Sequence, residues 1–296
     1  MIMYSTIADI LEQSDTSKKE FWEVVMEADM ESRDVSREAS REKMKQMLDV
    51  MRDADRSYEG DRKSASGLCG GDGKLLEAYN RAGKNLCGAF LGKVMERAIK
   101  MGESNACMKR IVAAPTAGSC GVIPAVLLSY GEYGNVPEEV LINALYVAAG
   151  LGKVIGENAS IAGASGGCQA EIGTASAMAA GALAYLQGGD NTAIADAAAL
   201  ALKNMLGLAC DPVGGLVEVP CVKRNSHGAV NAVASAQLAL AGVKSAISPD
   251  DVIDSMRRIG NEMPASLKET GKGGLAITES AKKLCDCSTG GFCFGA

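Results

Sequence analysis

Positively charged stripes and aromatic residues are scarce in this chain of 296 residues. Aromatic side chains make up 4% of the sequence, and acidic residues outnumber basic ones, which gives a net charge of -6. Proteins that bind nucleic acid usually carry a basic stripe with interleaved aromatic residues, and no such stripe is present. We therefore expect no nucleic-acid partner.

A secretion signal and a disulfide framework are also missing. No apolar amino-terminal stretch precedes a small-residue cleavage site, so we expect a cytoplasmic protein whose ten cysteines stay reduced. Their spacing lacks the regularity of a small secreted scaffold. Because cysteine-rich chains in a reducing compartment more often bind metal or catalyse reactions, metal binding is favoured over disulfides.

Charge is distributed unevenly and divides the chain into three predicted regions. Residues 1–63 form the first region, in which 14–63 alternate acidic and basic side chains and carry apolar residues at helical spacing, which predicts an amphipathic helical region. Residues 64–276 form the predicted main domain, in which segment 111–221 holds only eleven charged residues. Residues 277–296 follow a glycine-rich break and are expected to be a flexible tail.

Helical periodicity and capping residues predict an all-α fold for the main domain. A proline and two glutamates at 137–139, and Ser248 before a proline and two aspartates, mark two helix starts. The best of the few strand signals is at 215–219. The predicted helices are Val122–Tyr130, Pro137–Val154, Gln169–Leu186, Thr192–Leu206, Ala229–Leu240 and Pro249–Ile259.

One stretch, 170–186, is almost uncharged and was weighed as a membrane span. A spanning helix needs about 20 predominantly apolar residues, whereas alanine and glycine are only weakly hydrophobic. Loops rich in Lys or Arg are also missing. We therefore predict no membrane span, and interpret the small residues as allowing helices to approach one another closely.

Three cysteines, Cys168, Cys210 and Cys221, each lie in a segment marked by glycine or proline. Cys168 precedes a predicted helix, where unpaired backbone N–H groups favour a thiolate. Cys210 and Cys221 are separated by a glycine-containing loop that can bring their sulfurs together. Their spacing matches no compact zinc or ferredoxin pattern, so burial as small apolar side chains remains an open alternative for each.

Two other segments offer polar groups near helix starts. Thr116 and Ser119 precede a predicted helix, which is typical of a carboxylate or phosphate site but also of plain N-capping. Gly70, Gly71 and Asp72 lie in a glycine-rich turn that resembles a phosphate loop. The required hydroxyl residue is missing from it, since Leu75 stands in that position.

Long blocks of the sequence resemble the alpha subunit of bacterial iron-sulfur-dependent L-serine dehydratase, in matching order. The resemblance is strong over about residues 64–276. It implies a [4Fe-4S] cluster held by Cys168, Cys210 and Cys221, on an all-helical domain that works with a separate beta subunit in a hetero-oligomer. The blocks are SGLCGGDGKLLEAY, APTAGSCGVIPAVL, NASIAGASGGCQAEIGTASAMAAGA, LKNMLGLACDPVGGLVEVPCVKRN, GAVNAVASAQLALAG and MPASLKETGKGGLA.

The resemblance implies a dehydration of L-serine. The iron without a cysteine ligand acts as a Lewis acid on the β-hydroxyl, a base removes the α-proton, and the aminoacrylate product hydrolyses to pyruvate and ammonia. The substrate-binding candidates are the polar groups of the glycine-rich segments, namely Thr116, Ser119, Asn158, Ser160, Gly70, Gly71 and Asp72.

The general base is not identified in this chain. The single histidine, His227, is interpreted as incidental, although histidine is the usual general base. The resemblance implies that the beta subunit supplies a histidine, so the isolated chain is expected to be nearly inactive. Lys223 and Arg224, beside Cys221, either offset the negative charge of the cluster or are solvated.

Several alternatives remain open from the sequence. An iron-sulfur L-cysteine desulfidase is the nearest, a pyridoxal-phosphate lyase using Lys153 is another, and a non-catalytic helical subunit that holds metal is a third. The cysteines of the tail, Cys285, Cys287 and Cys293, are compatible with a disordered end, a redox or metal site, or a flap that reaches the active centre.

Overall fold

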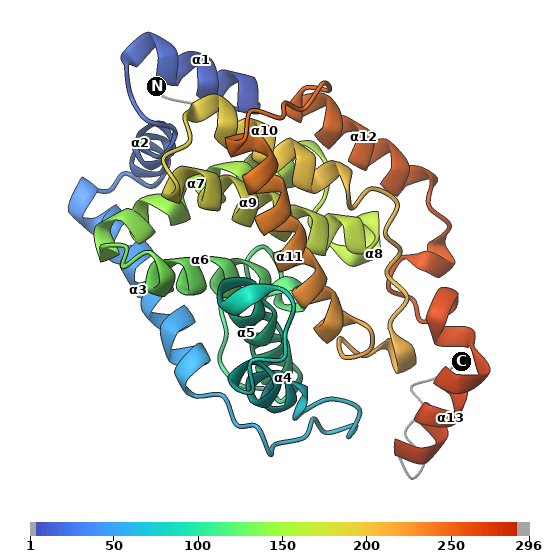
Figure 1. Ribbon diagram of the computed structural model, residues 1–296. Helices are drawn as coiled ribbons and strands as arrows, with labels where there is room; N and C mark the ends of the chain where they lie inside the picture. Colours follow the sequence, from blue (N-terminus) through green and yellow to red (C-terminus); the bar gives the residue numbers. More distant parts are fainter. Residues whose placement is uncertain (1–3, 289–296) are drawn as a thin grey trace.

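The computed structural model describes residues 4–288, and within them the chain is built from helices alone (Figure 1). No strand is present in that range, where only an isolated parallel bridge joins Cys210 to Lys268. The predicted all-α fold is confirmed. The strand signal at 215–219 was wrong, because Gly214 and Gly215 take positive φ angles and the segment folds back so that the Val213 N–H donates to the Val219 carbonyl.

The helices fall into an amino-terminal group, a central group and a carboxy-terminal group. The first group is α1 (Ile7–Ser17), α2 (Phe21–Arg33) and α3 (Arg37–Arg56). The second is α4 (Asp72–Arg81), α5 (Gly88–Ala106), η1 (Ala117–Ser119), α6 (Val122–Tyr133), α7 (Glu138–Asn158), α8 (Gly163–Gly166), η2 (Gln169–Gly173), α9 (Thr174–Leu186) and α10 (Asn191–Lys203). The third is η3 (Val213–Gly215), α11 (Cys221–Leu240), α12 (Pro249–Glu262), η4 (Ala265–Leu267), η5 (Gly274–Ile277) and α13 (Glu279–Ser288).

Helix α9 lies in the middle of the fold, in contact with α6, α7, α10 and α11 (Figure 1). Its small residues permit this close packing. A β-carbon added to Gly181 would lie 2.4 Å from Leu151 of α7, and one added to Gly228 of α11 would lie 2.8 Å from Ile172. Real side chains do not tolerate such distances, so these glycines set how closely the helices approach.

The amino-terminal helices belong to the same core as the rest. The predicted amphipathic pattern is present in α2 and α3, whose apolar residues Phe21, Val25 and Leu48 are fully buried. Val25 packs against Gly150 of α7, where an added β-carbon would lie 2.4 Å from its methyl group. Residues 4–56 are therefore continuous with the helical core through their apolar faces.

Helix α7 is the one described helix that is long and apolar enough to cross a membrane by length and composition. About two thirds of its most apolar window is buried inside the protein, as expected for a core helix. The stretch 170–186, which the sequence singled out, forms η2 and α9 instead and is enclosed by other helices.

Helix α11 begins eight positions before its predicted start, at Cys221. Glycine and a run of polar residues at the beginning of this helix conceal its helical periodicity. The Asn225 side chain explains why the early turn is stable, since its amide donates to the carbonyls of Cys221 and Gly118 and its oxygen accepts from the Gly121 N–H. This residue joins α11 to the segment that carries Thr116 and Ser119.

Candidate functional site

Cys168 is held by a turn that is fixed on both sides. Gly167 before it has a φ of 76°, which favours glycine, and Gln169 after it begins the short π-helix η2. The Gln169 N–H donates to the Leu208 carbonyl at 3.0 Å, while its side-chain oxygen accepts from the Gly207 N–H at 2.9 Å. The loop of Cys168 is thereby joined to the loop that carries Cys210.

Cys210 is fixed by backbone pairing with the segment after η4. Its N–H donates to the Leu267 carbonyl at 2.8 Å, and its carbonyl accepts from the Glu269 N–H at 2.7 Å. Glu269 adopts a left-handed φ of 62°, unusual for a residue other than glycine. This pairing brings residues nearly sixty positions apart in the sequence to the same place.

Arg224 connects the loop of Cys210 to α11, the helix that starts at Cys221. Its guanidinium donates to the Ala209 carbonyl at 2.8 Å and to the Asp211 carboxylate at 2.9 Å. Arg224 and Asp211 are both largely buried, and Asp211 also accepts from the Leu275 N–H. The sequence left open whether Lys223 and Arg224 offset the charge of a cluster or are solvated. Arg224 is held inside the protein, whereas Lys223 is half-exposed and pairs with Asp72 at 2.6 Å.

The three thiols are buried, free and electrostatically coupled to one another. Burial raises the pKa of Cys168 to about 11 and that of Cys221 to about 12. Burial also raises the pKa of Cys210, with further contributions from Cys168, Glu171 and Cys221. Arg224 opposes this effect at Cys168, where it supplies both positive charge and a hydrogen bond.

Two carboxylates complete the site, at Glu171 and Glu269. Their oxygens and the sulfur of Cys210 all lie within 4.8 Å of one another, which is a spacing that can hold a metal ion. The Glu171 carboxylate accepts from the Thr116 hydroxyl at 2.9 Å, and that hydroxyl lies 3.1 Å from the one of Ser119. Burial raises the pKa of Glu171, and the charge of Glu269 raises it further.

The donor set of the site fits a thiophilic metal group. Three cysteines offer soft thiolate ligands, and such ligands select iron-sulfur clusters, zinc or Cu(I). At Gly163 an added β-carbon would lie 2.9 Å from both Cys210 Sγ and the Glu171 carboxylate, so the thiol and the carboxylate leave no room for a side chain there. The site therefore has the thiol ligands that such a metal group requires, and Gly163 lets Cys210 and Glu171 approach its backbone closely.

The other predicted substrate-binding residues lie at different distances from this centre. Gly70, Gly71 and Asp72 are connected to α11 through the Asp72–Lys223 ion pair. Asn158 uses its amide at the end of α7, donating to the carbonyls of Ser5 and Val154. The Ser160 hydroxyl accepts from the Ala162 N–H. The structure thus brings Thr116 and Ser119 to Glu171, and gives Asn158 and Ser160 backbone partners outside the thiol cluster.

Two further residues singled out by the sequence, Lys153 and His227, have surroundings of their own. Lys153 pairs with Glu157, and its ammonium lies 4.7 Å from the centre of the Tyr4 ring, on the side of the fold formed by the amino-terminal segment. A Schiff-base role for Lys153 therefore finds no support. His227 is exposed on α11, and its interpretation as incidental stays a prediction.

The cysteines of the tail are only partly described. Cys285 of α13 approaches η3, since a β-carbon added to Gly214 would lie 3.4 Å from its sulfur. It therefore packs against the loop between Cys210 and Cys221. Nothing is described of the Cys287 side chain, and Cys293 lies outside the described residues.

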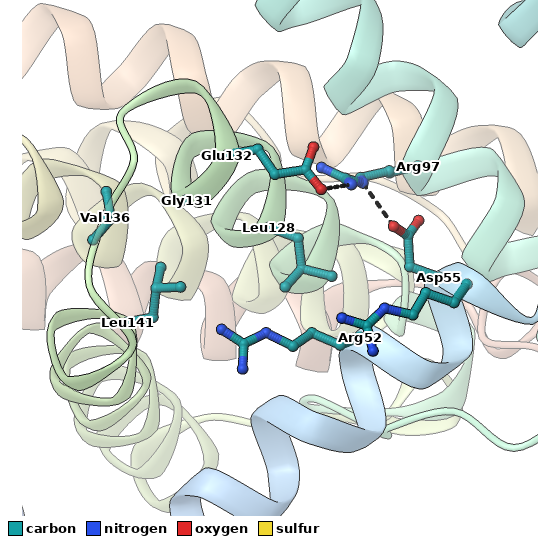
Figure 2. A pocket seen from close by; sticks show the side chains of 9 residues that line it. Arg52, Asp55, Arg97, Leu128, Gly131, Glu132, Val136 and Leu141 are labelled. Carbon is teal, nitrogen blue, oxygen red and sulfur yellow. Dashed lines mark hydrogen bonds and ion pairs between the residues drawn. The ribbon is translucent and has the colours of Figure 1, made fainter.

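A cavity among the described residues is separate from the thiols. It has a volume of about 300 Å³ and lies between α3, α5, α6 and α7 (Figure 2). Arg97 lines it and forms ion pairs with Asp55 and Glu132 (Figure 2). Arg52 and Arg56 also line the cavity and pair with carboxylates outside it. Because its charged side chains all have partners and it contains no nucleophile, the cavity does not compete with the cysteine site as the centre of chemistry.

Sequence reasoning missed Glu171, Glu269, Asp211 and Asn225. Glu171 was detectable in principle, because it follows Cys168 by three positions and a helical turn places such residues on one face. Glu269 was not, because its position depends on the backbone pairing with Cys210. Asp211 and Asn225 stabilise the site through contacts with segments distant in the sequence, and no local sequence pattern predicts such contacts.

Comparison with known proteins places these residues in a family context. Residues 16–276 match a family model described as serine dehydratase alpha chain. A probable L-serine dehydratase alpha chain of Bacillus subtilis is 52% identical over 221 residues, which cover 75% of this chain and 74% of that protein. An L-serine dehydratase alpha chain of Peptoniphilus asaccharolyticus is 46% identical over 214 residues, covering 72% and 73%.

A longer relative shows the same region within a larger protein. An L-serine dehydratase of Streptomyces coelicolor is 45% identical over 182 residues, which cover 61% of this chain but only 40% of the relative. The longer protein therefore contains substantial sequence beyond the matched region.

Proposed function

The chain belongs to the serine dehydratase alpha-chain family, as its motifs predicted, and we propose that it converts L-serine to pyruvate and ammonia as the alpha chain of an L-serine dehydratase. The observation that supports this proposal is that three buried thiols lie on separate segments that hydrogen bonds of Gln169 and Arg224 join to one another. Relatives named as alpha chains of this enzyme match most of the chain and supply the substrate class.

Cys168, Cys210 and Cys221 are the proposed ligands of a [4Fe-4S] cluster. When bound, a cluster with three cysteine ligands supplies a Lewis-acidic iron that can bind a hydroxyl or carboxylate of the substrate. The raised pKa values of the thiols mean that their protons are released when metal binds. Arg224, which already donates toward Cys168, stabilises the resulting negative charge.

The chain's own residues bind and orient the substrate in this proposal. Thr116 fixes the Glu171 carboxylate, and Ser119 lies beside Thr116 at the start of the segment that α11 holds through Asn225. Burial of the thiols limits access of water. Gly70, Gly71, Asp72, Asn158 and Ser160 remain predictions as substrate-binding residues.

A partner chain completes the proposed enzyme. Among the described residues the only histidine is exposed His227, which leaves the removal of the α-proton without an assigned base. The extra sequence in the Streptomyces relative and the naming of the shorter relatives as alpha chains both support a separate beta subunit. We place the assembly in the cytoplasm, where thiols such as these stay reduced.

An anaerobic assay of the chain with and without the beta subunit tests the function. We expect pyruvate from L-serine with both chains present and a rate at least about a hundredfold lower for this chain alone, since a general base contributes about 10²–10⁴ in rate. Full activity of the isolated chain would disprove the assignment of the base to the partner. Release of sulfide from L-cysteine, without pyruvate formation from L-serine, would instead identify a desulfidase.

A further inference from the structure

Gln169, the residue that follows Cys168, is completely buried and uses both ends of its side-chain amide. Its oxygen accepts from the Gly207 N–H at 2.9 Å, and its nitrogen donates to the Met256 carbonyl of α12 at 3.0 Å. Its backbone N–H donates to the Leu208 carbonyl at 3.0 Å. One residue therefore joins the turn of Cys168 to two other segments of the chain.

The first of these segments leads directly to Cys210. Gly207 and Leu208 come shortly before that cysteine, in a stretch that forms no regular helix. Backbone outside a helix has no hydrogen-bond ladder of its own to fix its position, so it depends on partners from elsewhere in the chain. Since Gln169 supplies two of these partners, the separation between Cys168 and Cys210 depends on it.

The second segment, α12, anchors this bridge to a regular helix. A β-carbon added to Gly260 of α12 would lie 3.1 Å from the Gly166 Cα and 3.3 Å from the Gln169 Nε2. Such distances are shorter than ordinary van der Waals contacts, so α12 packs directly against the turn of Cys168. The amide of Gln169 is therefore enclosed between the two loops and the helix.

The chemistry of the bridge fits glutamine. The Gly207 N–H needs an acceptor and the Met256 carbonyl accepts from a donor, and a side-chain amide of this length offers both. A carboxylate would only accept, and an aliphatic side chain would do neither. A buried polar side chain is unfavourable unless it is hydrogen-bonded. Gln169 therefore contributes a fixed geometry that an apolar side chain of the same size would not provide.

We propose that Gln169 is a positioning residue of the metal centre, which holds Cys168 and Cys210 at the separation that a shared cluster needs. It touches neither the cluster nor the substrate, and it acts through the two loops that it joins. The inference rests on the proposed function for the identity of the bound group. Residues that orient metal ligands typically change metal affinity by about 10- to 100-fold when they are replaced.

Gln169→Leu tests the proposal, because leucine has a similar volume and makes neither side-chain hydrogen bond. The complex of alpha and beta chains is purified anaerobically, and the release of iron to a ferrous chelator is followed together with iron content, sulfide content and melting temperature. We expect iron release at least about tenfold faster than in wild type.

Gln169→Asn is a second variant that keeps the amide on a side chain one carbon shorter. Because the shorter side chain cannot reach both segments, this variant should also release iron faster than wild type. If Gln169→Leu does not fold, Gln169→Asn decides the question.

Asn143→Leu is the matched control for a loss of stability. The Asn143 amide also accepts once and donates once, from Arg41 of α3 and to the Tyr185 hydroxyl of α9. None of the helices that it joins carries a cysteine of the site. We expect this variant to have a lower melting temperature but an iron release within about twofold of wild type.

The proposal is overturned if the Gln169 variants release iron at the wild-type rate. It is also overturned if Asn143→Leu releases iron as fast as they do, since iron loss would then follow from lower stability alone, or if the wild-type complex holds no iron. Failure of the proposed function has a different signature, because the wild-type complex would then hold iron but form no pyruvate from L-serine, while the Gln169 variants would still release iron faster.

Discussion

Helix α5 and the cysteine site both bury ionisable groups, but the charges on α5 are paired with opposite charges, whereas most ionisable groups of the cysteine site are not. On α5, Arg97 pairs with Asp55 and Glu132, and Lys100 pairs with Glu96 and Glu77. Buried Glu103 accepts from the N–H groups of Asp72 and Gly73. At the cysteine site, Arg224 is engaged with Asp211 and Cys168, while the carboxylates of Glu171 and Glu269 have no ion-pair partner among the described residues.

The difference separates a structural network from a functional one. Buried charges that are paired and hydrogen-bonded are common in folded proteins, and their loss affects stability. A cluster of groups of one sign is unfavourable by itself and is retained where a ligand of opposite charge binds. By this criterion α5 serves the fold, while the cysteine site is the proposed place for metal and substrate.

Single replacement of Cys168, Cys210 or Cys221 by serine is expected to have the largest effect. Because a hydroxyl is a poor ligand for iron, each variant should lose the cluster and more than about 99% of the serine-to-pyruvate activity. Iron, sulfide and pyruvate are measured after anaerobic purification. Cys120→Ser is the control, since Cys120 is equally buried but donates to the Met101 carbonyl on α5. Any of the three variants that keeps iron and activity removes its residue from the proposed ligands.

Replacement of buried Arg97 or Arg224 by methionine is expected to have the second largest effect. Arg224→Met leaves the buried Asp211 carboxylate without its cation and should lower the free energy of unfolding by about 3 kcal/mol or more. Arg97→Met removes the cation that pairs with partly buried Asp55 and exposed Glu132, and should lower the free energy of unfolding as well. Only Arg224→Met is expected to lower iron content as well, because it also removes the positive charge beside Cys168. Thermal unfolding and metal analysis distinguish the two. Equal iron loss in both variants would show that stability alone controls the metal.

The pH dependence of stability should differ in sign between the two regions. Burial works to raise the pKa of Glu96, but hydrogen bonds from Lys100 and Lys93 outweigh it and lower this pKa. Glu96→Gln therefore destabilises the protein at neutral pH, and the difference shrinks as the pH falls below about 4.3, the ordinary value for glutamate.

Glu171 is the opposite case, since burial and then Glu269 raise its pKa. In the iron-free protein, Glu171→Gln is expected to raise the melting temperature at neutral pH. That gain should disappear as the pH falls below about 4.3, where the carboxyl is protonated in both states. Melting curves between pH 4 and pH 8 test both variants. Two curves that shift in the same direction would contradict the distinction between the regions.

Replacement of His227 by alanine is expected to have the smallest effect. This exposed side chain lies on α11 outside the thiol cluster, so activity of the two-chain enzyme should change by less than about twofold, as surface substitutions usually do little. A large loss of activity with normal iron content would identify His227 as the base and remove that role from the partner.

The sequence predicted the helical class, because helical periodicity is a local pattern, and its long motifs singled out the three cysteines, whose role as ligands stays a prediction. It placed α11 too late, since the first turn of that helix is stabilised by the contacts of Asn225 with another segment. It also missed Glu269, which reaches Cys210 only through backbone pairing in the folded protein. What could not be predicted is therefore the part of the site that depends on contacts between distant segments.

The most direct test of the account is metal analysis of the chain purified anaerobically with its beta subunit. The account predicts a brown, oxygen-sensitive complex with about four iron and four sulfide per alpha chain, as a [4Fe-4S] cluster requires. A colourless complex that contains zinc or no metal, and still converts L-serine to pyruvate, would contradict the proposed role of Cys168, Cys210 and Cys221.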